Sequence, residues 1–314
     1  MKLIKNSLIT IKQKGLIGFF MAVINFLLIL FYQKFLPTNL IKKRIFDFRM
    51  FLNPIDRGIS RTLILFGVRE LDHKKILELV LKKNMKVFDL GANIGYYVLM
   101  ESSIVGKNGK IIAIEPVPEN MKLLKKNLEL NKNNITTTMQ VGISNLTEEK
   151  NFLLSEHSNL GHIIDDKHSK NYKNKKKIKI QTISLNKLIK KTLFPDFIRM
   201  DVEGYEEYIL KDLINLKLKK YPIICFETHL SKYKKMKDVL KKLFNKGYRI
   251  KYASSSSESG SLKLKNLGYK PIFKDIKTDD VTREIFKNIK KKHSIKLICE
   301  LGGLRTVLMV CDNR

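Results

Sequence analysis

Thirty consecutive residues, KVFDLGANIGYYVLMESSIVGKNGKIIAIE (86–115), decide the fold of this chain. The run 86–90 is short and apolar, which predicts a buried strand. Gly91 and Gly95 follow at once and predict a tight turn into a helix that continues to Val105. The run 110–115 predicts a second strand. This order favours two parallel strands joined by a crossover helix.

The same alternation continues along the chain. Further strands are predicted at 136–141, 197–201, 223–228 and 248–253, and further helices at 119–130, 205–216 and 233–245. This order predicts an α/β fold with a parallel, doubly wound sheet covered on both faces. Two apolar runs around Gly302 and Gly303 (294–310) predict a hairpin that adds a terminal antiparallel strand. The polar stretch 155–179 and the Ser-rich stretch 254–261 predict surface loops.

The amino terminus carries an uncharged apolar segment. Residues 15–33 lie between Lys14 and Lys34, and their number is close to the roughly 20 residues of a membrane-spanning helix. A helix packed on its own domain is the alternative, and a signal peptide fits poorly because no small-residue cleavage site follows. The flanking charges do not decide an orientation. We divide the chain into a hydrophobic segment (1–36), a helical connector (37–84) and a catalytic domain (85–314).

Composition narrows the function classes. The chain has 314 residues, 44% of them hydrophobic, which is enough for a substantial core. Its net charge of +31 favours an anionic partner, but the cations are mostly Lys and the chain is rich in Ile and Asn, so the charge carries little functional weight. Three cysteines without a CxxC pair exclude a disulfide framework or a cysteine zinc site. We therefore expect an intracellular protein.

The glycine turn predicts a nucleotide site. Asp89 ends the first strand and Gly91 and Gly95 lie at the entry to a helix, at the sheet edge where such folds bind ligands. Glu115 ends the next strand, where its carboxylate can accept hydrogen bonds from both ribose hydroxyls. The pattern predicts an adenosine-containing ligand. It departs from the dinucleotide fingerprint because Asn93 stands at a glycine position, and no phosphate-binding GxxxxGK[ST] run is present.

Four motifs resemble known methyltransferases. VFDLGANIGYY (87–97) resembles the first motif of class I S-adenosylmethionine-dependent methyltransferases, and AIEPVPEN (113–120) resembles the second. FIRMDVEGYE (197–206) and DRGISRTLILFGVRE (56–70) resemble the FkbM-type methyltransferases in particular. The resemblance implies a Rossmann-like, seven-stranded, mostly parallel sheet with an antiparallel last strand. It also implies methylation of hydroxyl groups, often on sugars or polyketide-type products.

The resemblance also assigns cofactor residues. By position, it places four residues along the methionine and adenosine side of S-adenosylmethionine: Asp89, Gly91, Asn93 and Gly95. Glu115 would hold the ribose. Gly142 and Ser144, at the end of the third strand, would lie near the adenine.

Methyl transfer to a hydroxyl also needs a group that removes its proton. The candidates follow the fourth and fifth strands of the predicted sheet: Asp201, Glu203, Glu227 and His229. Alternation along a strand places Glu227 and His229 on one face. The group supports either a general base, His229 oriented by Glu227, or an oxygen and imidazole site for a divalent metal. The structural alternative for Asp201 and Glu203 is that they cap the following helix.

Three function classes follow. The leading hypothesis is an O-methyltransferase acting on a glycan, glycolipid or other small acceptor, held by residues 15–33 at the cytoplasmic face of a membrane. An RNA methyltransferase that tracks phosphates with the basic run 173–179 is the alternative within the enzymes, although no RNA-binding module is recognisable. A membrane-tethered nucleotide-binding module without catalysis is the third.

Overall fold

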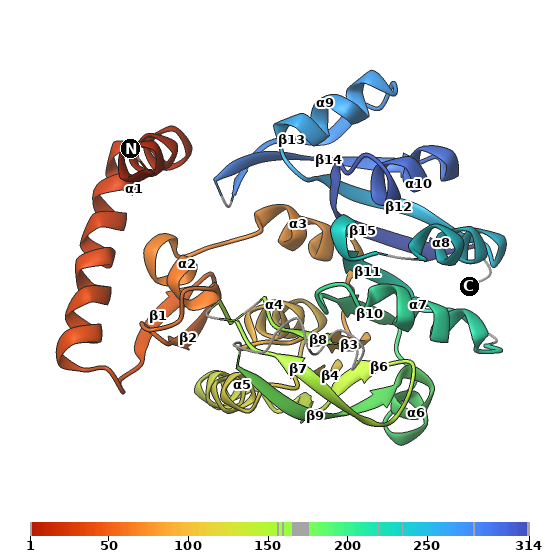
Figure 1. Ribbon diagram of the computed structural model, residues 1–314, viewed down its shortest axis with the longest axis horizontal. Helices are drawn as coiled ribbons and strands as arrows, with labels where there is room; N and C mark the ends of the chain where they lie inside the picture. The colour runs from red at the N-terminus through yellow and green to blue at the C-terminus, as the bar shows by residue number, and fades with distance from the viewer. Residues whose placement is uncertain are drawn as a thin grey trace.

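A nine-stranded sheet forms the centre of the protein (Figure 1). The computed structural model describes residues 2–155, 157–158, 160–164, 176–218, 220–233, 235–278 and 280–312. In spatial order the strands are β13 (Pro271–Thr278), β14 (Val281–Ile289), β12 (Tyr248–Ser255), β15 (Leu304–Cys311), β11 (Ile223–Glu227), β10 (Phe197–Met200), β3 (Lys86–Leu90), β4 (Lys110–Ile114) and β5 (Thr136–Met139).

Seven of these strands confirm the predicted Rossmann-like sheet. The strands β5, β4, β3, β10 and β11 are mutually parallel, and β15 runs antiparallel between β11 and β12. The last strand of the chain therefore inserts into the sheet instead of joining its edge. The antiparallel hairpin β13–β14 extends the sheet beyond β12.

Two local predictions near the carboxyl terminus were wrong. Residues 294–310 do not form a hairpin, because helix α10 (Lys291–Cys299) precedes β15 and buries Leu297 and Ile298. Gly302 and Gly303 form the turn between that helix and the strand. The stretch 254–261 is also ordered, since β12 continues to Ser255 and α9 (Glu258–Asn266) follows.

Helices cover both faces of the sheet, as predicted. One face packs against α3 (Leu71–Val80), α4 (Tyr96–Val105) and α5 (Pro118–Leu130). The other packs against α6 (Leu185–Lys191), α7 (Glu206–Asn215), α8 (Met236–Asn245) and α10. Neighbouring residues of a strand pack on opposite faces of the sheet. Val87 packs in the core under α3, α4 and α5, and Phe88 in the core under α6, α7, α8 and α10. This alternation explains why the strands are apolar throughout.

A second, smaller sheet lies over the carboxyl edge of the main sheet (Figure 1). Its order is β6 (Gly142–Ser144), β9 (Lys177–Ser184), β7 (Glu149–Leu153) and β8 (His162–Ile164). Phe152 and Ile163 of this sheet pack with Val117 and Tyr205 of the main domain. The insertion predicted at 155–179 thus contains β8, while its residues 165–175 lie outside the described part of the chain, as do residues 173–175 of the basic run.

The amino-terminal region packs on the first helical layer. Helix α1 (Lys2–Phe35) is interrupted at Gly15 (φ 73°, ψ 178°). The expected helical connector contains α2 (Ile59–Phe66) and α3 but also an antiparallel hairpin of β1 (Ile41–Ile45) and β2 (Phe48–Leu52). Elsewhere in the described part of the chain, a short 3₁₀ turn (Leu230–Lys232) follows β11. The division at residues 36 and 84 stays a prediction.

Asn127 joins three of these parts. Its side chain is fully buried on α5. Its Oδ1 accepts a hydrogen bond from Phe51 N–H of β2 (2.7 Å), and its Nδ2 donates to the carbonyls of Ile94 (2.9 Å) and Phe51 (3.3 Å). One amide therefore ties the hairpin and the glycine turn to the helix behind them.

We predict that Asn127→Ala lowers the free energy of unfolding by about 1–3 kcal/mol, because it leaves buried backbone groups without partners. Asn131→Ala is the matched control. Its amide bridges Arg49 N–H and C=O of the same strand at an exposed position, where water replaces the lost bonds. Urea unfolding of both variants checks this, and an equal loss for Asn131→Ala would contradict it.

Candidate functional site

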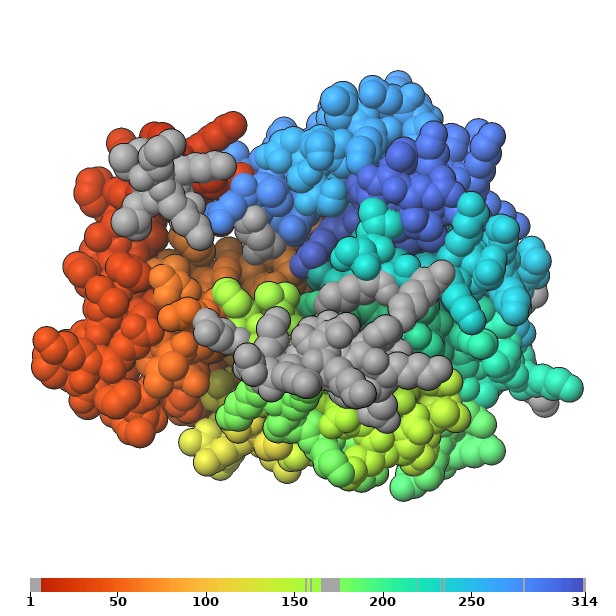
Figure 2. Space-filling view, in the orientation of Figure 1, coloured from red at the N-terminus to blue at the C-terminus, as the bar shows by residue number. Residues whose placement is uncertain are grey.

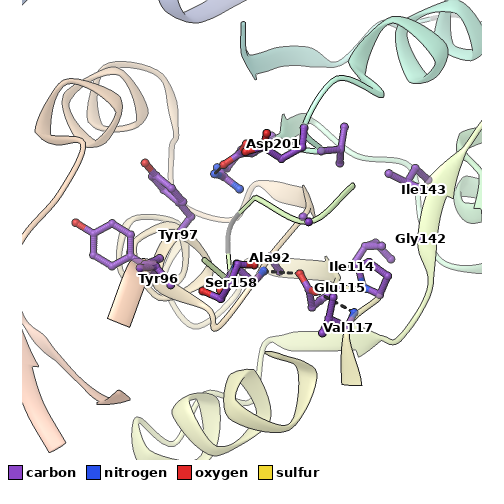
Figure 3. Close-up of a pocket in the computed structure, with 18 of the residues that line it drawn as sticks. Ala92, Tyr96, Tyr97, Ile114, Glu115, Val117, Gly142, Ile143, Ser158 and Asp201 are labelled. Atoms are coloured by element: carbon purple, nitrogen blue, oxygen red, sulfur yellow. Dashed lines mark hydrogen bonds and ion pairs between the residues drawn. The ribbon is translucent and has the colours of Figure 1, made fainter. Parts of the chain in front are cut away.

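A cavity opens at the carboxyl ends of β3, β4 and β10, beneath the small sheet. It encloses about 790 Å³, part of which is open to solvent. The strand order reverses here, since β4 and β5 lie on one side of β3 and β10 and β11 on the other. Ligands bind doubly wound sheets at such a switch point. Figure 3 shows Tyr96 and Tyr97 on one side of the cavity and Gly142 and Ile143 on the other.

The glycine turn forms the floor of the cavity. Gly91 has a φ of +87°, and a Cβ there would lie 2.1 Å from the carbonyl oxygen of Asp201. Gly95 has a φ of +91°, and a Cβ there would lie 2.6 Å from Leu124 Cδ1. A side chain at either position meets both a strained backbone and a clash. The two predicted glycines therefore let β3, β10 and α5 approach closely.

Glu115 lies at the end of β4 with both carboxylate oxygens engaged. Its oxygens accept from the backbone N–H of Asn93 (2.8 Å) and of Val117 (2.9 Å), which fixes the side chain toward the cavity (Figure 3). Burial raises the pKa of Glu115 to about 7, although these hydrogen bonds oppose the rise. Asn120 Nδ2 also donates to this carboxylate (3.2 Å), so three donors already occupy it. A carboxylate has about four acceptor positions, so capacity remains for about one hydroxyl donor.

Asn93 connects the glycine turn to the insertion. Its backbone is left-handed (φ 48°), and its Nδ2 donates to the carbonyl of Ser158 (3.1 Å). Asp56 in turn holds Ser158, by accepting from its N–H (3.1 Å) and its hydroxyl (3.0 Å). Asp56 also accepts from Ser60 N–H at the start of α2. No site role was predicted for Asp56, although it is the first residue of the motif 56–70 that resembles the FkbM-type methyltransferases.

Arg199 is the main residue that the sequence reasoning missed. Its side chain is buried at the end of β10, with Nη1 2.8 Å from Asp89 and Nη2 3.1 Å from Asp201. The guanidinium also lies 3.8 Å from the centre of the Tyr97 ring. Asp89 therefore pairs with Arg199 behind the cavity wall. The available signal was a charged residue inside an otherwise apolar parallel strand.

His229 lies among carboxylates. Its Nδ1 is 3.1 Å from Glu206, and its Nε2 is 3.3 Å from Glu227 and 3.6 Å from Glu203. The contacts lack hydrogen-bond alignment, so the attraction is mainly ionic. Burial opposes the charge, but the carboxylates prevail and raise the pKa of His229 to about 11. An imidazolium cannot accept a proton, so His229 acts as the expected general base only after it has released this proton, and that role stays a prediction.

Glu206, the first residue of α7, accepts hydrogen bonds from the loop that precedes this helix. Its carboxylate accepts from Val202 N–H (3.1 Å) and Gly204 N–H (3.0 Å). These bonds fix the loop but do not cap α7, because the N-cap residue Tyr205 makes no side-chain cap hydrogen bond. The structural alternative had Asp201 and Glu203 capping this helix. Both of those side chains instead belong to the cavity lining.

Three donors could hold a divalent metal ion. Donor atoms of Asp201, Glu227 and His229 all lie within 4.8 Å of one another. Carboxylate and imidazole donors fit such an ion, which would acidify a substrate hydroxyl. Arg305 already pairs with Glu227 (2.5 Å), and Arg199 with Asp201. To bind a metal ion, His229 would also have to release its proton, and the neighbouring carboxylates oppose that release.

The structure brings most of the predicted site residues to one cavity. Its lining includes six of them: Gly91, Asn93, Glu115, Gly142, Asp201 and Glu203. In the described part of the chain the other four stand behind the lining. Asp89 pairs with Arg199, Gly95 begins α4, and Glu227 and His229 form the charge cluster next to Glu203.

The fold and this site together define a class I S-adenosylmethionine-dependent methyltransferase. The chain belongs to the FkbM methyltransferase domain family, whose model matches residues 89–250. A protein-L-isoaspartate O-methyltransferase of Methanococcus maripaludis is 36% identical over 72 residues, which are 23% of this chain and 34% of that protein. The match thus spans about a third of the length of that relative.

Solved methyltransferase structures are among those to which this chain is similar. A precorrin-6y C5,15-methyltransferase from Geobacter metallireducens is 13% identical, with a TM-score of 0.40 over 78% of this chain and 90% of that one. A SAM-dependent O-methyltransferase from Thermotoga maritima is 13% identical, with a TM-score of 0.38 over 77% of this chain and 65% of that one. Aeropyrum pernix fibrillarin with bound S-adenosyl-L-methionine is 13% identical, with a TM-score of 0.36 over 78% of this chain and 84% of that one. At these TM-scores the likeness specifies no activity.

We predict that Gly91→Ala weakens S-adenosylmethionine binding at least about tenfold, or about 1.4 kcal/mol, because the added methyl meets the carbonyl of Asp201. Gly67→Ala is the control. Gly67 also has a positive φ (+76°), but a Cβ there has no heavy atom within 4 Å. Its cost is therefore confined to backbone strain. Calorimetric titration checks both variants, and equal affinities would contradict the close approach.

Cofactor affinity should depend on pH through Glu115. Above pH 7 the carboxylate is ionised and should accept from a ribose hydroxyl, whereas protonation below pH 7 removes acceptor capacity. Between pH 8 and pH 6 the ionised fraction falls about tenfold, and we expect the affinity to fall similarly. Glu115→Gln should bind more weakly and lose this dependence. A wild-type affinity that stays constant over this range would exclude Glu115 from ribose binding.

Proposed function

We propose that the protein transfers the methyl group of S-adenosylmethionine to a hydroxyl of a glycan, glycolipid or other small acceptor. The observation that carries this proposal is the position of Asp201, a carboxylate in the cavity lining whose backbone touches the glycine turn. This position supports a role for Asp201 as the proton acceptor beside the expected cofactor site. The relative from M. maripaludis, named as an O-methyltransferase, supports oxygen as the accepting atom.

The proposed reaction is a direct displacement. The acceptor oxygen attacks the methyl carbon as the carbon–sulfur bond breaks, and the hydroxyl proton passes to the Asp201 carboxylate. The products are the methyl ether, S-adenosylhomocysteine and a protonated Asp201. Arg199 orients Asp201 through its Nη2. Glu115 and the glycine turn hold the cofactor.

The charge cluster behind the cavity has a positioning role in this proposal. His229 keeps its proton and holds Glu203 and Glu227 in place by charge. Burial raises the pKa of Glu227 to about 7, and the nearby Asp201 contributes to the rise, while Arg305 opposes it. Glu203 faces the cavity and contacts the acceptor or the cofactor amino group. A divalent metal ion, if bound, would be held by Asp201, Glu227 and a deprotonated His229 and would supply Lewis acidity toward the hydroxyl.

The acceptor end of the cavity combines aromatic and charged groups. Tyr96 and Tyr97 line this end with Arg69 and Glu70. The Tyr97 hydroxyl donates to Glu70, which Arg305 also contacts (3.3 Å). Aromatic faces and hydrogen-bonding groups together suit a polar, ring-containing acceptor. The apolar amino terminus supports a location at the cytoplasmic face of a membrane.

The test is to incubate the protein with methyl-labelled S-adenosylmethionine and host extract separated into lipid, glycan, RNA and protein fractions. We expect label in the glycan or glycolipid fraction. Asp201→Asn should reduce labelling at least about a hundredfold, as expected for loss of a general base, and should lower cofactor affinity far less. Asp238→Asn, an exposed carboxylate on α8, should have no effect.

Other outcomes would replace the proposal. Label in RNA, with substrate affinity that falls steeply with salt, would make the basic surface functional and the protein an RNA methyltransferase. Cofactor binding without any labelling, with and without added Mg²⁺, would indicate a nucleotide-binding module without catalysis.

A further inference from the structure

Helix α1 presents one narrow stripe to the protein. Ala22 and Ile29 are buried, and the polar side chain between them faces the same way, since Asn25 Nδ2 donates to the carbonyl of Leu65 on α2 (3.1 Å). Further along, Gln33 Nε2 donates to the carbonyl of Pro54 (2.8 Å). The spacing of these residues is that of one helical face. The amide side chains of the apolar segment therefore point toward protein.

The opposite face is apolar and exposed. Ile17, Ile24 and Phe31 recur every seven residues and are 82%, 59% and 50% exposed. They are accompanied by further exposed apolar side chains: Leu16, Phe20, Met21, Val23, Leu27, Leu28, Leu30 and Phe35. In Figure 2 this helix forms one edge of the molecule. A contiguous apolar surface of this kind marks an interaction site.

The packing of α1 argues against a simple membrane crossing. The helix passes the length test for a span, with 11% of its apolar window buried. However, α2 packs along its middle, and the Arg61 guanidinium lies 5.3 Å from the centre of the Phe26 ring. A perpendicular α1 would carry Arg61 to the centre of the bilayer, where a charge is expensive. A helix lying in the membrane plane avoids this cost.

The charged residues around α1 indicate the kind of surface to which its apolar face binds. The first 46 residues contain eight Lys and Arg and no Asp or Glu. Lys12 and Lys34 are exposed at the two ends of the apolar stretch, and Lys42 and Arg44 are exposed on the adjacent hairpin. Basic side chains around an apolar helix face complement an anionic lipid surface.

We propose that the exposed face of α1 docks in the plane of an anionic lipid bilayer, half-inserted and without crossing it. The inference deepens the membrane association proposed above. Helix α2 connects the docked face with the cavity. Ile59 in its first turn lines the cavity, and the same helix packs against α1. A lipid-linked acceptor would then reach the cavity from the surface on which the protein lies.

The chain contains no tryptophan, so single introduced tryptophans report without background. We would place Ile17→Trp, Ile24→Trp and Phe31→Trp separately in the full chain. Each would be mixed with vesicles of phosphatidylcholine and phosphatidylglycerol brominated at defined acyl carbons. Successive positions are about 10 Å apart along a helix. In-plane docking predicts quenching at one shared, shallow depth for all three.

Leu262→Trp on α9 is the matched control, because Leu262 is 59% exposed, like Ile24; its fluorescence should not change with vesicles. Binding to pure phosphatidylcholine should be at least about tenfold weaker than to the mixed vesicles. Deep quenching at position 24 with shallow quenching at 17 and 31 would overturn the proposal in favour of a span. A concentration-dependent blue shift without quenching would overturn it in favour of self-association. Depth is measured without methyl transfer, so a failed activity assay leaves this test intact.

Discussion

The site depends on one buried guanidinium. Arg199 lies between Asp89 at the end of β3 and Asp201 at the end of β10, and it packs on Tyr97 of α4. A buried charge is tolerated only when it is paired, and removing one partner leaves the others uncompensated. The planar guanidinium of arginine presents rigidly oriented donors to both carboxylates, whereas the ammonium of lysine is a compact charge without that fixed geometry. This contact fixes where the glycine turn, the proton acceptor and the aromatic wall stand relative to one another.

The surrounding charges form a connected network. Arg305 links Glu227 to Glu70. Burial alone would raise the pKa of Glu70, but Arg69 and Arg305 hold it well below its usual range. Behind this network, burial and the charge of Asp89 raise the pKa of Glu101 well above its usual range, which Arg199 opposes. The pKa values of Glu70 and Glu101 are thus shifted in opposite directions on two sides of the same network. Such divergent environments are typical of functional sites.

The predictions that held rest on local rules. Gly91 and Gly95 occupy left-handed backbone that short-range sterics restrict to glycine, and Glu115 follows a strand whose end is readable from its apolar run. The rule that parallel strands end at one edge also brought Asp201 to the cavity. The hairpin predicted at 294–310 was wrong because a local pattern alone was used for a segment that contains α10. Short apolar runs are ambiguous between helix and strand until their packing partners are known.

The sequence by itself determined the alternating architecture, the glycine turn, its acidic partner and the family, because each is encoded within a few consecutive residues. Only the tertiary structure decided the charge states and the partners. The pKa of His229 is raised because Glu206 and Glu227 converge on its ring from separate segments of the chain. The apolar helix acquired a protein face and an exposed face only when α2 packed against it. Coulomb forces and burial depend on distances in space, which no local pattern of residues specifies.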